Sequence, residues 1–192
     1  MLFVVRMKTY DTRNEMIADL LKPGMRVAEL GVWKGEFAKE ILKTKPCELV
    51  LVDPWKGMMP SGNADGNNVQ VANLDQEYWR LCREYQGNRK VKLIRALSWD
   101  ALEGFPDNYF NAIYIDSSHD YLATKKELLM ALRKVKEGGY IMGHDYGQNF
   151  AKTNNKYDFG VQRACDEFCD EFFYEVNAIA NDGCRSFCIY ID

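Results

Sequence analysis

The sequence predicts an α/β fold, a doubly wound and mostly parallel seven-stranded sheet with helices on both faces and an antiparallel C-terminal hairpin. Three observations support this prediction. Short apolar runs alternate with segments of helical periodicity along most of the chain. The first long apolar run passes through two glycines into a helix pattern, and the last two runs are joined by Asn181-Asp-Gly183, a hairpin signal. Without a linker or repeat, residues 1–192 are expected to form one domain.

The elements are expected in the following order. Thr12-Arg-Asn-Glu15 is a capping-box pattern that opens a helix in an N-terminal segment 1–24, and Lys22-Pro-Gly24 ends that helix. Short apolar runs predict strands at 26–30, 48–52, 91–95, 110–115, 140–143, 173–179 and 187–191. Apolar residues at helical spacing predict the intervening helices at 36–43, around 78–82, at 121–134 and at 161–168.

Two polar stretches, at 56–71 and 146–158, are long for connections inside a compact domain. We expect both to be substrate loops, and a plain surface loop is the alternative for the first.

Composition excludes several classes of function. The net charge is -3 and no basic stripe is visible, which argues against a nucleic-acid partner. The apolar run at residues 2–5 is too short for a membrane helix or a signal-peptide core, so no membrane association is expected and a cytoplasmic location is predicted. The six cysteines form no Cys-x-x-Cys pair, and reduced thiols in the cytosol fit them best.

The turn Val27-Ala-Glu-Leu-Gly-Val-Trp-Lys-Gly-Glu-Phe37 is the most informative segment. A dinucleotide fingerprint has a glycine at its middle position, where the pyrophosphate approaches the backbone, and this chain has Trp33 there. Glu29 places a carboxylate close to the same turn. Both features favour a cationic or zwitterionic nucleoside, and S-adenosylmethionine is the candidate. A tight strand–helix connection without a ligand is the alternative.

Two further strand ends carry candidate cofactor residues. Asp53 follows the glycine turn by about twenty residues, the usual spacing for an acid that binds both ribose hydroxyls. Its alternative role is to cap the turn at Pro54. The small residues before Trp99 would suit an adenine slot, although that indole could equally be part of the core.

The next two strands end in Asp116-Ser-Ser-His119 and in His144-Asp145. Adjacent parallel strands would bring Asp116, His144 and Asp145 to one edge of the sheet, where oxygen and imidazole ligands could hold a divalent cation. The alternative is helix capping by the acids and two hydrogen-bonded surface histidines.

Together these motifs resemble those of class I S-adenosylmethionine-dependent methyltransferases, which have a Rossmann-like sheet. The most similar branch is methyltransferase family 24, which includes the macrolide-sugar and aminocoumarin-sugar O-methyltransferases. The resemblance runs from about residue 25 to the C-terminus. The motifs that carry it are Glu29-Leu-Gly-Val-Trp-Lys-Gly35, Asp53-Pro54, Ile115-Asp116-x-x-His119-x-Tyr121, Gly138-Gly139-Tyr140-Ile-x-Gly143-His144-Asp145-Tyr146, and Phe159-Gly160-Val161 with Ala164-x-x-x-Phe168.

The resemblance implies a role for individual residues. Glu29 and Gly31 would border the methionine part of the cofactor, Asp53 the ribose, and Leu97 with Ser98 the adenine. The full set of implied cofactor-binding residues is Glu29, Gly31, Val32, Trp33, Asp53, Leu97, Ser98 and Asp116.

In the sugar-modifying relatives three acids bind magnesium. Asp116 and Asp145 match two of them, and His144 replaces the third. Because imidazole is a poorer magnesium ligand, three outcomes are open: another divalent cation, weak magnesium binding, or no metal. His119 matches the general base of those relatives. Asp116 and His119 are therefore the implied catalytic residues.

The expected activity is methyl transfer from S-adenosylmethionine to a small-molecule acceptor, at a hydroxyl oxygen, with or without help from Mg²⁺ or another divalent cation. Two alternatives stay open. One is a cofactor-binding protein that has lost catalysis, and the other is a nicotinamide-dependent oxidoreductase, against which Trp33 speaks. The oligomeric state is also open, a homo-oligomer included.

Overall fold

A single sheet forms the centre of the computed structural model, which describes residues 7–56, 74–147 and 160–192. Its strands are β1 (Lys8–Tyr10), β2 (Arg26–Leu30), β3 (Glu48–Asp53), β4 (Val91–Arg95), β5 (Phe110–Ile115), β6 (Val135–Gly143), β7 (Val176–Ala180) and β8 (Ser186–Ile191). The helices are α1 (Arg13–Leu20), α2 (Glu36–Lys43), α3 (Leu74–Glu84), α4 (Ser98–Glu103), α5 (Tyr121–Lys134) and α6 (Val161–Phe172).

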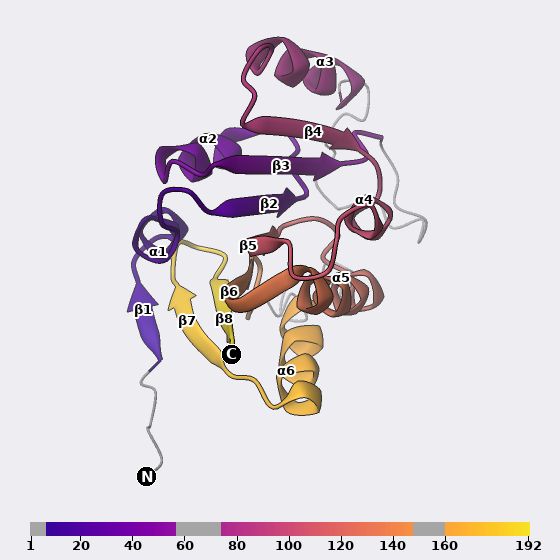
Figure 1. The fold of residues 1–192 in the computed structure, drawn as a ribbon. Coiled ribbons are helices and arrows are strands. Elements are labelled where there is room, and N and C mark those ends of the chain that lie inside the picture. The colour runs from indigo at the N-terminus through magenta and orange to yellow at the C-terminus, as the bar shows by residue number, and fades with distance from the viewer. Residues whose placement is uncertain (1–6, 57–73, 148–159) are drawn as a thin grey trace.

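The strands lie in the order β1-β7-β8-β6-β5-β2-β3-β4 (Figure 1). β8 pairs antiparallel with both β6 and β7, and every other neighbouring pair is parallel. The predicted mostly parallel α/β sheet with an antiparallel C-terminal hairpin is therefore confirmed. The carboxyl ends of β2, β3, β4, β5 and β6 all face the same edge, because these strands run parallel to one another.

The predicted number of strands was wrong by one. The sheet has eight strands, because Lys8–Tyr10 pairs in parallel with Ala178–Ala180 of β7 and forms one edge of the sheet. The C-terminal hairpin therefore lies between β6 and β1 and not at the edge. A three-residue strand is too short to show a periodic pattern, and only its pairing partner reveals it.

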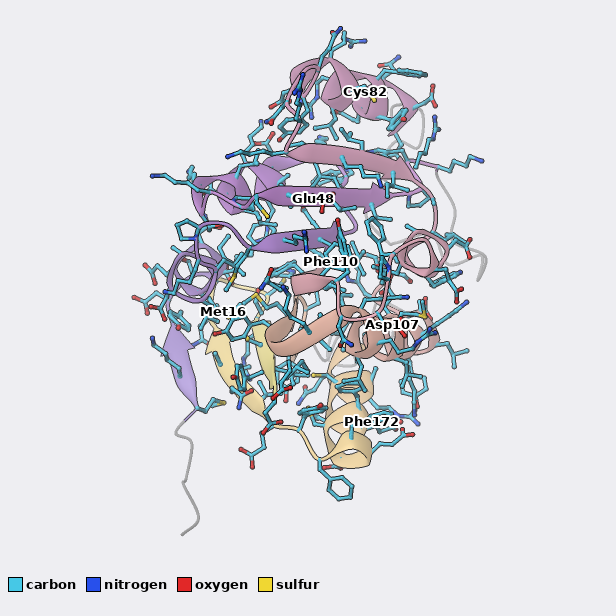
Figure 2. All side chains as sticks on the ribbon, viewed as in Figure 1. Met16, Glu48, Cys82, Asp107, Phe110 and Phe172 are labelled. Atoms are coloured by element: carbon cyan, nitrogen blue, oxygen red, sulfur yellow. The ribbon has the colours of Figure 1, made fainter. Side chains whose placement is uncertain are left out.

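Helices cover both faces of the sheet, as predicted, and the buried apolar residues form one cluster on each face. Side chains fill the space between the sheet and the helices (Figure 2). Adjacent residues of one strand point to opposite faces. Val50 of β3 belongs to the same apolar cluster as Leu128 of α5, whereas its neighbour Leu51 belongs to the cluster that contains Met16 of α1 and Phe37 of α2.

The first helix begins where the capping box predicted. Thr12 accepts a hydrogen bond from the backbone N–H of Glu15 at 3.1 Å, while the Glu15 carboxylate accepts from the N–H of Asp11 at 3.2 Å. Met16 and Ile17 are buried beneath this cap. The cap and the buried face of this helix thus place its first residue, Arg13, near the carboxyl edge of the sheet.

Several element boundaries differ from the prediction, and one helix was not predicted. α6 continues to Phe172, four residues beyond its predicted end, and Phe173 adopts a left-handed conformation at 94% exposure, so it belongs to no strand. β6 begins at Val135, directly after α5. Ser98–Glu103 forms the helix α4, where the sequence pattern had indicated only the end of a strand.

The predicted substrate loops at 56–71 and 146–158 lie almost wholly outside the described residues. Within the residues that are described, no helix combines the length and apolar character needed to cross a bilayer.

Candidate functional site

The candidate site lies at the carboxyl ends of β2, β3, β5 and β6. Gly31 directly follows β2 and has a φ of +86°, and a Cβ atom there would lie 2.0 Å from the carbonyl oxygen of Asp116. The N–H of Asp116 donates to the carbonyl of Leu30 at 2.7 Å, and the N–H of His144 donates to that of Ile115 at 3.0 Å. Only glycine fits at this position, so the turn after β2 is held directly against the end of β5.

Asp53 binds the glycine turn. Its Oδ2 accepts from the backbone N–H groups of Val32, at 2.9 Å, and Trp33, at 2.8 Å, and its Oδ1 accepts from that of Trp55 at 2.6 Å. Burial raises the pKa of Asp53, and these three bonds partly oppose the rise. The capping role is therefore present in the structure, and it takes three of the roughly four acceptor positions of the carboxylate.

The side chain of Trp33 lies at the mouth of this turn. Trp33 has a φ of 48° and is 49% exposed, and its carbonyl accepts from the indole N–H of Trp55 at 2.9 Å. Trp55 itself is buried. The Trp55 indole thus supports the turn from within the core, whereas the Trp33 side chain is half exposed.

Glu29 is a buried acid beside the turn. It is 1% exposed, and among the described residues its Oε2 has no hydrogen-bond partner. Burial raises its pKa well above the ordinary value, the charges of Asp116 and Asp53 add to the rise, and Arg13 opposes it. The surroundings of this carboxyl group therefore favour its protonated form.

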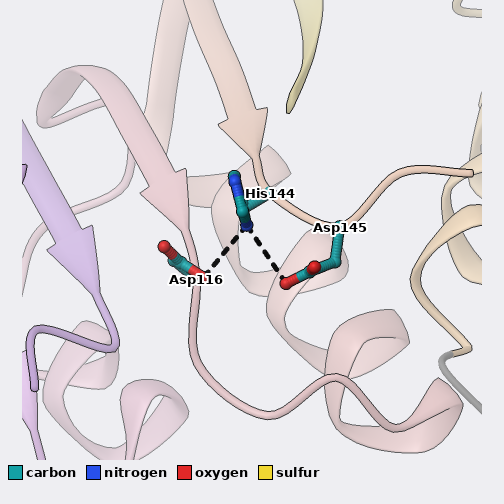
Figure 3. Close-up of side chains that lie close together, drawn as sticks. All are labelled: Asp116, His144 and Asp145. Atoms are coloured by element: carbon teal, nitrogen blue, oxygen red, sulfur yellow. Dashed lines mark hydrogen bonds and ion pairs between the residues drawn. The ribbon is translucent and has the colours of Figure 1, made fainter. Parts of the chain in front are cut away.

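Asp116, His144 and Asp145 come together as the sequence predicted they would (Figure 3). The Nδ1 of His144 lies 3.8 Å from Asp116 Oδ1 and 3.2 Å from Asp145 Oδ2, and one ligand atom from each residue falls within 4.8 Å of the others. Two carboxylates and an imidazole at these separations form a donor set that fits a divalent cation.

His119 joins this group through Asp145. Its Nδ1 lies 3.0 Å from Asp145 Oδ2, so that oxygen lies between two imidazole nitrogens. Burial alone would raise the pKa of Asp145, but the bonds and charges of His119 and His144 outweigh it, and the pKa falls below its ordinary value. Asp145 is thus ionised and can orient both rings.

Arg13 is a site residue that no sequence motif indicated. Its Nη1 lies 3.0 Å from Asp116 Oδ2, its guanidinium lies over the ring of Phe37 at 4.3 Å, and its backbone N–H donates to Asp182 Oδ2 at 2.9 Å. Burial raises the pKa of Asp116, whereas the charges of His144 and Arg13 lower it. No sequence signal could have found this pair, because 103 positions separate its members.

Leu97 and Ser98 follow β4. Leu97 occupies the N-cap position of α4, Ser98 is buried, and α4 packs against α5. The ring of Trp99 is covered by the ammonium group of Lys126 at 4.2 Å. The segment with the two predicted adenine-bordering residues is thus fixed to α5.

Comparison with known proteins identifies the fold. A family model, Methyltransf_24, described as a methyltransferase domain, matches residues 28–146, more than half of the chain. No curated protein sequence matches. The O-methyltransferase NovP is 20% identical, with a TM-score of 0.65 over 93% of this chain and 79% of that one.

Two other solved structures show the same fold. The N-methyltransferase NodS from Bradyrhizobium japonicum is 10% identical, with a TM-score of 0.61 over 94% of this chain and 95% of that one. Fibrillarin from Aeropyrum pernix, in complex with natively bound S-adenosyl-L-methionine, is 12% identical, with a TM-score of 0.58 over 88% of this chain and 68% of that one.

Proposed function

This chain belongs to the Methyltransf_24 family of methyltransferase domains, and on that basis we propose that it transfers the methyl group of S-adenosylmethionine to a hydroxyl oxygen of a small-molecule acceptor. The observation that carries the proposal is the convergence of Asp116, His119, His144 and Asp145 beside the glycine turn. The sulfonium methyl group is already activated, so the protein needs mainly to align a nucleophile behind it and to remove its proton.

The cofactor would lie over the carboxyl ends of the strands. It would lie against the turn at Gly31, Val32 and Trp33, which Glu29 and Asp116 border on the side of β5. The remaining acceptor capacity of Asp53 would serve the ribose, and Leu97 with Ser98 would border the adenine.

Asp116, His144 and Asp145 would hold a divalent cation, if one takes part. Imidazole in place of a third carboxylate favours Mn²⁺ or another transition-metal ion over Mg²⁺. When bound, such an ion lowers the pKa of an acceptor hydroxyl and fixes its direction. The residues fit this role, because their donor atoms already face one another.

His119 would be the general base. A neutral imidazole that donates from Nδ1 to Asp145 carries its lone pair on Nε2. That nitrogen would take the proton from the acceptor hydroxyl, and Asp145 would stabilise the imidazolium that forms. A carboxylate that orients the base plays the same role in other catalytic sites.

The test is calorimetric titration with S-adenosylhomocysteine, run with and without Mn²⁺ or Mg²⁺. We expect micromolar binding, and an affinity that depends on the cation would support the cation site. No binding under any condition would overturn the methyltransferase proposal, and binding of NAD in its place would indicate an oxidoreductase.

Turnover is tested separately, by release of S-adenosylhomocysteine across matched hydroxyl and amine acceptors. Activity on hydroxyls supports O-methylation, whereas activity on amines alone would contradict it. Cofactor binding without turnover on any acceptor would favour a binding protein that has lost catalysis. We also propose a cytoplasmic location and no nucleic-acid substrate, on the basis of the net charge of -3.

A further inference from the structure

Glu127 is a buried acid for which the proposed mechanism has no role. It lies on the inner side of α5 at 1% exposure, in a helix whose other buried residues are mostly apolar. Burying a carboxyl group has a cost in free energy unless hydrogen bonds compensate for it. The partners of Glu127 therefore show what this residue does.

The first partner is in the loop that follows β5. The hydroxyl of Ser117 lies 2.5 and 2.6 Å from the two carboxylate oxygens of Glu127. Ser117 directly follows Asp116 and precedes His119 by two residues. Glu127 therefore holds the backbone that carries the candidate carboxylate and the candidate base.

The same loop contacts α5 at two other points. Asp120 caps the helix by accepting from the N–H of Ala123 at 3.0 Å, and Thr124 donates to the carbonyl of Ser118 at 3.2 Å. Positions 120, 124 and 127 lie on one face of a helix. The loop from Asp116 to Asp120 therefore packs against the first two turns of α5.

The second partner of Glu127 lies in another segment of the site. The hydroxyl of Ser98, at the start of α4, also favours the ionised carboxylate of Glu127 and lowers its pKa, and α4 packs against α5. Ser98 is itself buried and is one of the residues proposed to border the adenine. A single side chain therefore connects the adenine-bordering segment to the segment that carries Asp116 and His119.

We propose that Glu127 is a positioning residue for methyl transfer, because it fixes the adenine-bordering segment at Ser98 relative to the loop that carries Asp116 and His119. The proposal rests on the function proposed above. Glu127 touches neither of these two catalytic candidates directly and acts through the two serines. Groups that hold functional residues in place in this way typically change affinity or activity about 10- to 100-fold when they are removed.

The test compares three variants. Glu127→Leu removes the carboxylate that interacts with the two serine hydroxyls at similar volume, Glu127→Gln keeps a polar group there, and Met130→Ala weakens the apolar core of the same helix. The readouts are the Kd for S-adenosylhomocysteine by calorimetry, and amide hydrogen exchange in residues 97–100 and 116–120 without cofactor.

We expect Glu127→Leu to weaken S-adenosylhomocysteine binding by about tenfold or more and to speed exchange in both segments. Glu127→Gln should stay within about threefold of the wild-type Kd. Met130→Ala should lower the melting temperature without either local effect. The proposal is overturned if Glu127→Leu leaves affinity and exchange unchanged, or if Met130→Ala changes them as much.

Failure of the proposed function would give a different combination of binding and exchange results. A wild-type chain that does not bind S-adenosylhomocysteine would remove the methyltransferase function, while the exchange data would still decide whether Glu127 holds the two segments. If Glu127→Leu does not fold, Ser117→Ala, which removes the hydroxyl bonded to Glu127, takes its place with the same expected directions.

Discussion

The guanidinium of Arg13 and the carboxylate of Asp116 form an ion pair at 3.0 Å, between the first turn of α1 and the end of β5. The pair occupies Asp116 Oδ2, while Oδ1 faces His144. Arg13 lies outside the residues that match the family model, 28–146, so the N-terminal segment adds a positive charge to a site that the matched domain builds from acids and histidines.

Arg13→Gln should tighten the binding of Mn²⁺. A unit positive charge near a dication in a solvated site opposes binding by about 1.4 kcal/mol, roughly a tenfold change in affinity. Electron paramagnetic resonance of free Mn²⁺ measures the affinity directly, with Arg13→Lys, which keeps the charge, as the control. Weaker binding in the Gln variant would show that Arg13 orients Asp116 and does not oppose the cation.

Replacement of His119 by alanine should lower kcat by about 10²- to 10⁴-fold, the usual contribution of a general base. The affinity for S-adenosylhomocysteine should stay the same, because the proposed role of His119, held by Asp145 at 3.0 Å, is to remove a proton from the acceptor and not to bind the cofactor. Steady-state kinetics and calorimetry on the same preparation measure both quantities. Unchanged turnover in the variant would refute the role of base.

Gly31→Ala should be far more harmful than Gly24→Ala. Both glycines have nearly the same positive φ, +86° and +87°, but a Cβ at Gly31 would meet the carbonyl of Asp116 at 2.0 Å, whereas nothing lies within 4 Å at Gly24. Strain alone costs about 1 kcal/mol, and forced displacement of a packed backbone adds roughly 1–3 kcal/mol. Denaturant unfolding and cofactor titration compare the two variants, and equal losses would contradict the close approach of β2 and β5.

The stability of the protein should fall as the pH rises through the titration of Glu127. Burial raises the pKa of Glu127 from 4.5 to about 7, although its bonds to Ser117 and Ser98 oppose the shift. The folded state therefore binds more protons than the unfolded state between these values, and each pH unit in that window removes up to about 1.4 kcal/mol.

Glu127→Gln cannot titrate, so its stability relative to the wild type should increase from about pH 5 to about pH 8, by at most about 3 kcal/mol. Urea unfolding at the two pH values measures the difference. A constant difference between variant and wild type across this range would mean that the folded-state pKa of Glu127 is close to its ordinary value of 4.5.

The class of fold and the grouping of residues at the site could be predicted from local sequence patterns. Periodic apolar runs indicate the main strands and helices because each run is local, and the same holds for the cap at Thr12. Parallel strands bring their carboxyl ends to one edge, which is why the order of the strand ends along the chain suffices to group Asp116, His144 and Asp145.

The other features depend on partners distant in sequence, so they emerge only from tertiary packing. The edge strand at Lys8–Tyr10 exists through its pairing with β7, and the positive charge beside Asp116 comes from Arg13, 103 positions away. The helical pattern of the sequence does not indicate that Glu127 is buried or that it has a role. Its connection of Ser98 to Ser117 arises only when α4 and the loop after β5 both pack against α5. Sequence periodicity specifies which face of an element is buried, whereas packing alone specifies which polar groups meet there.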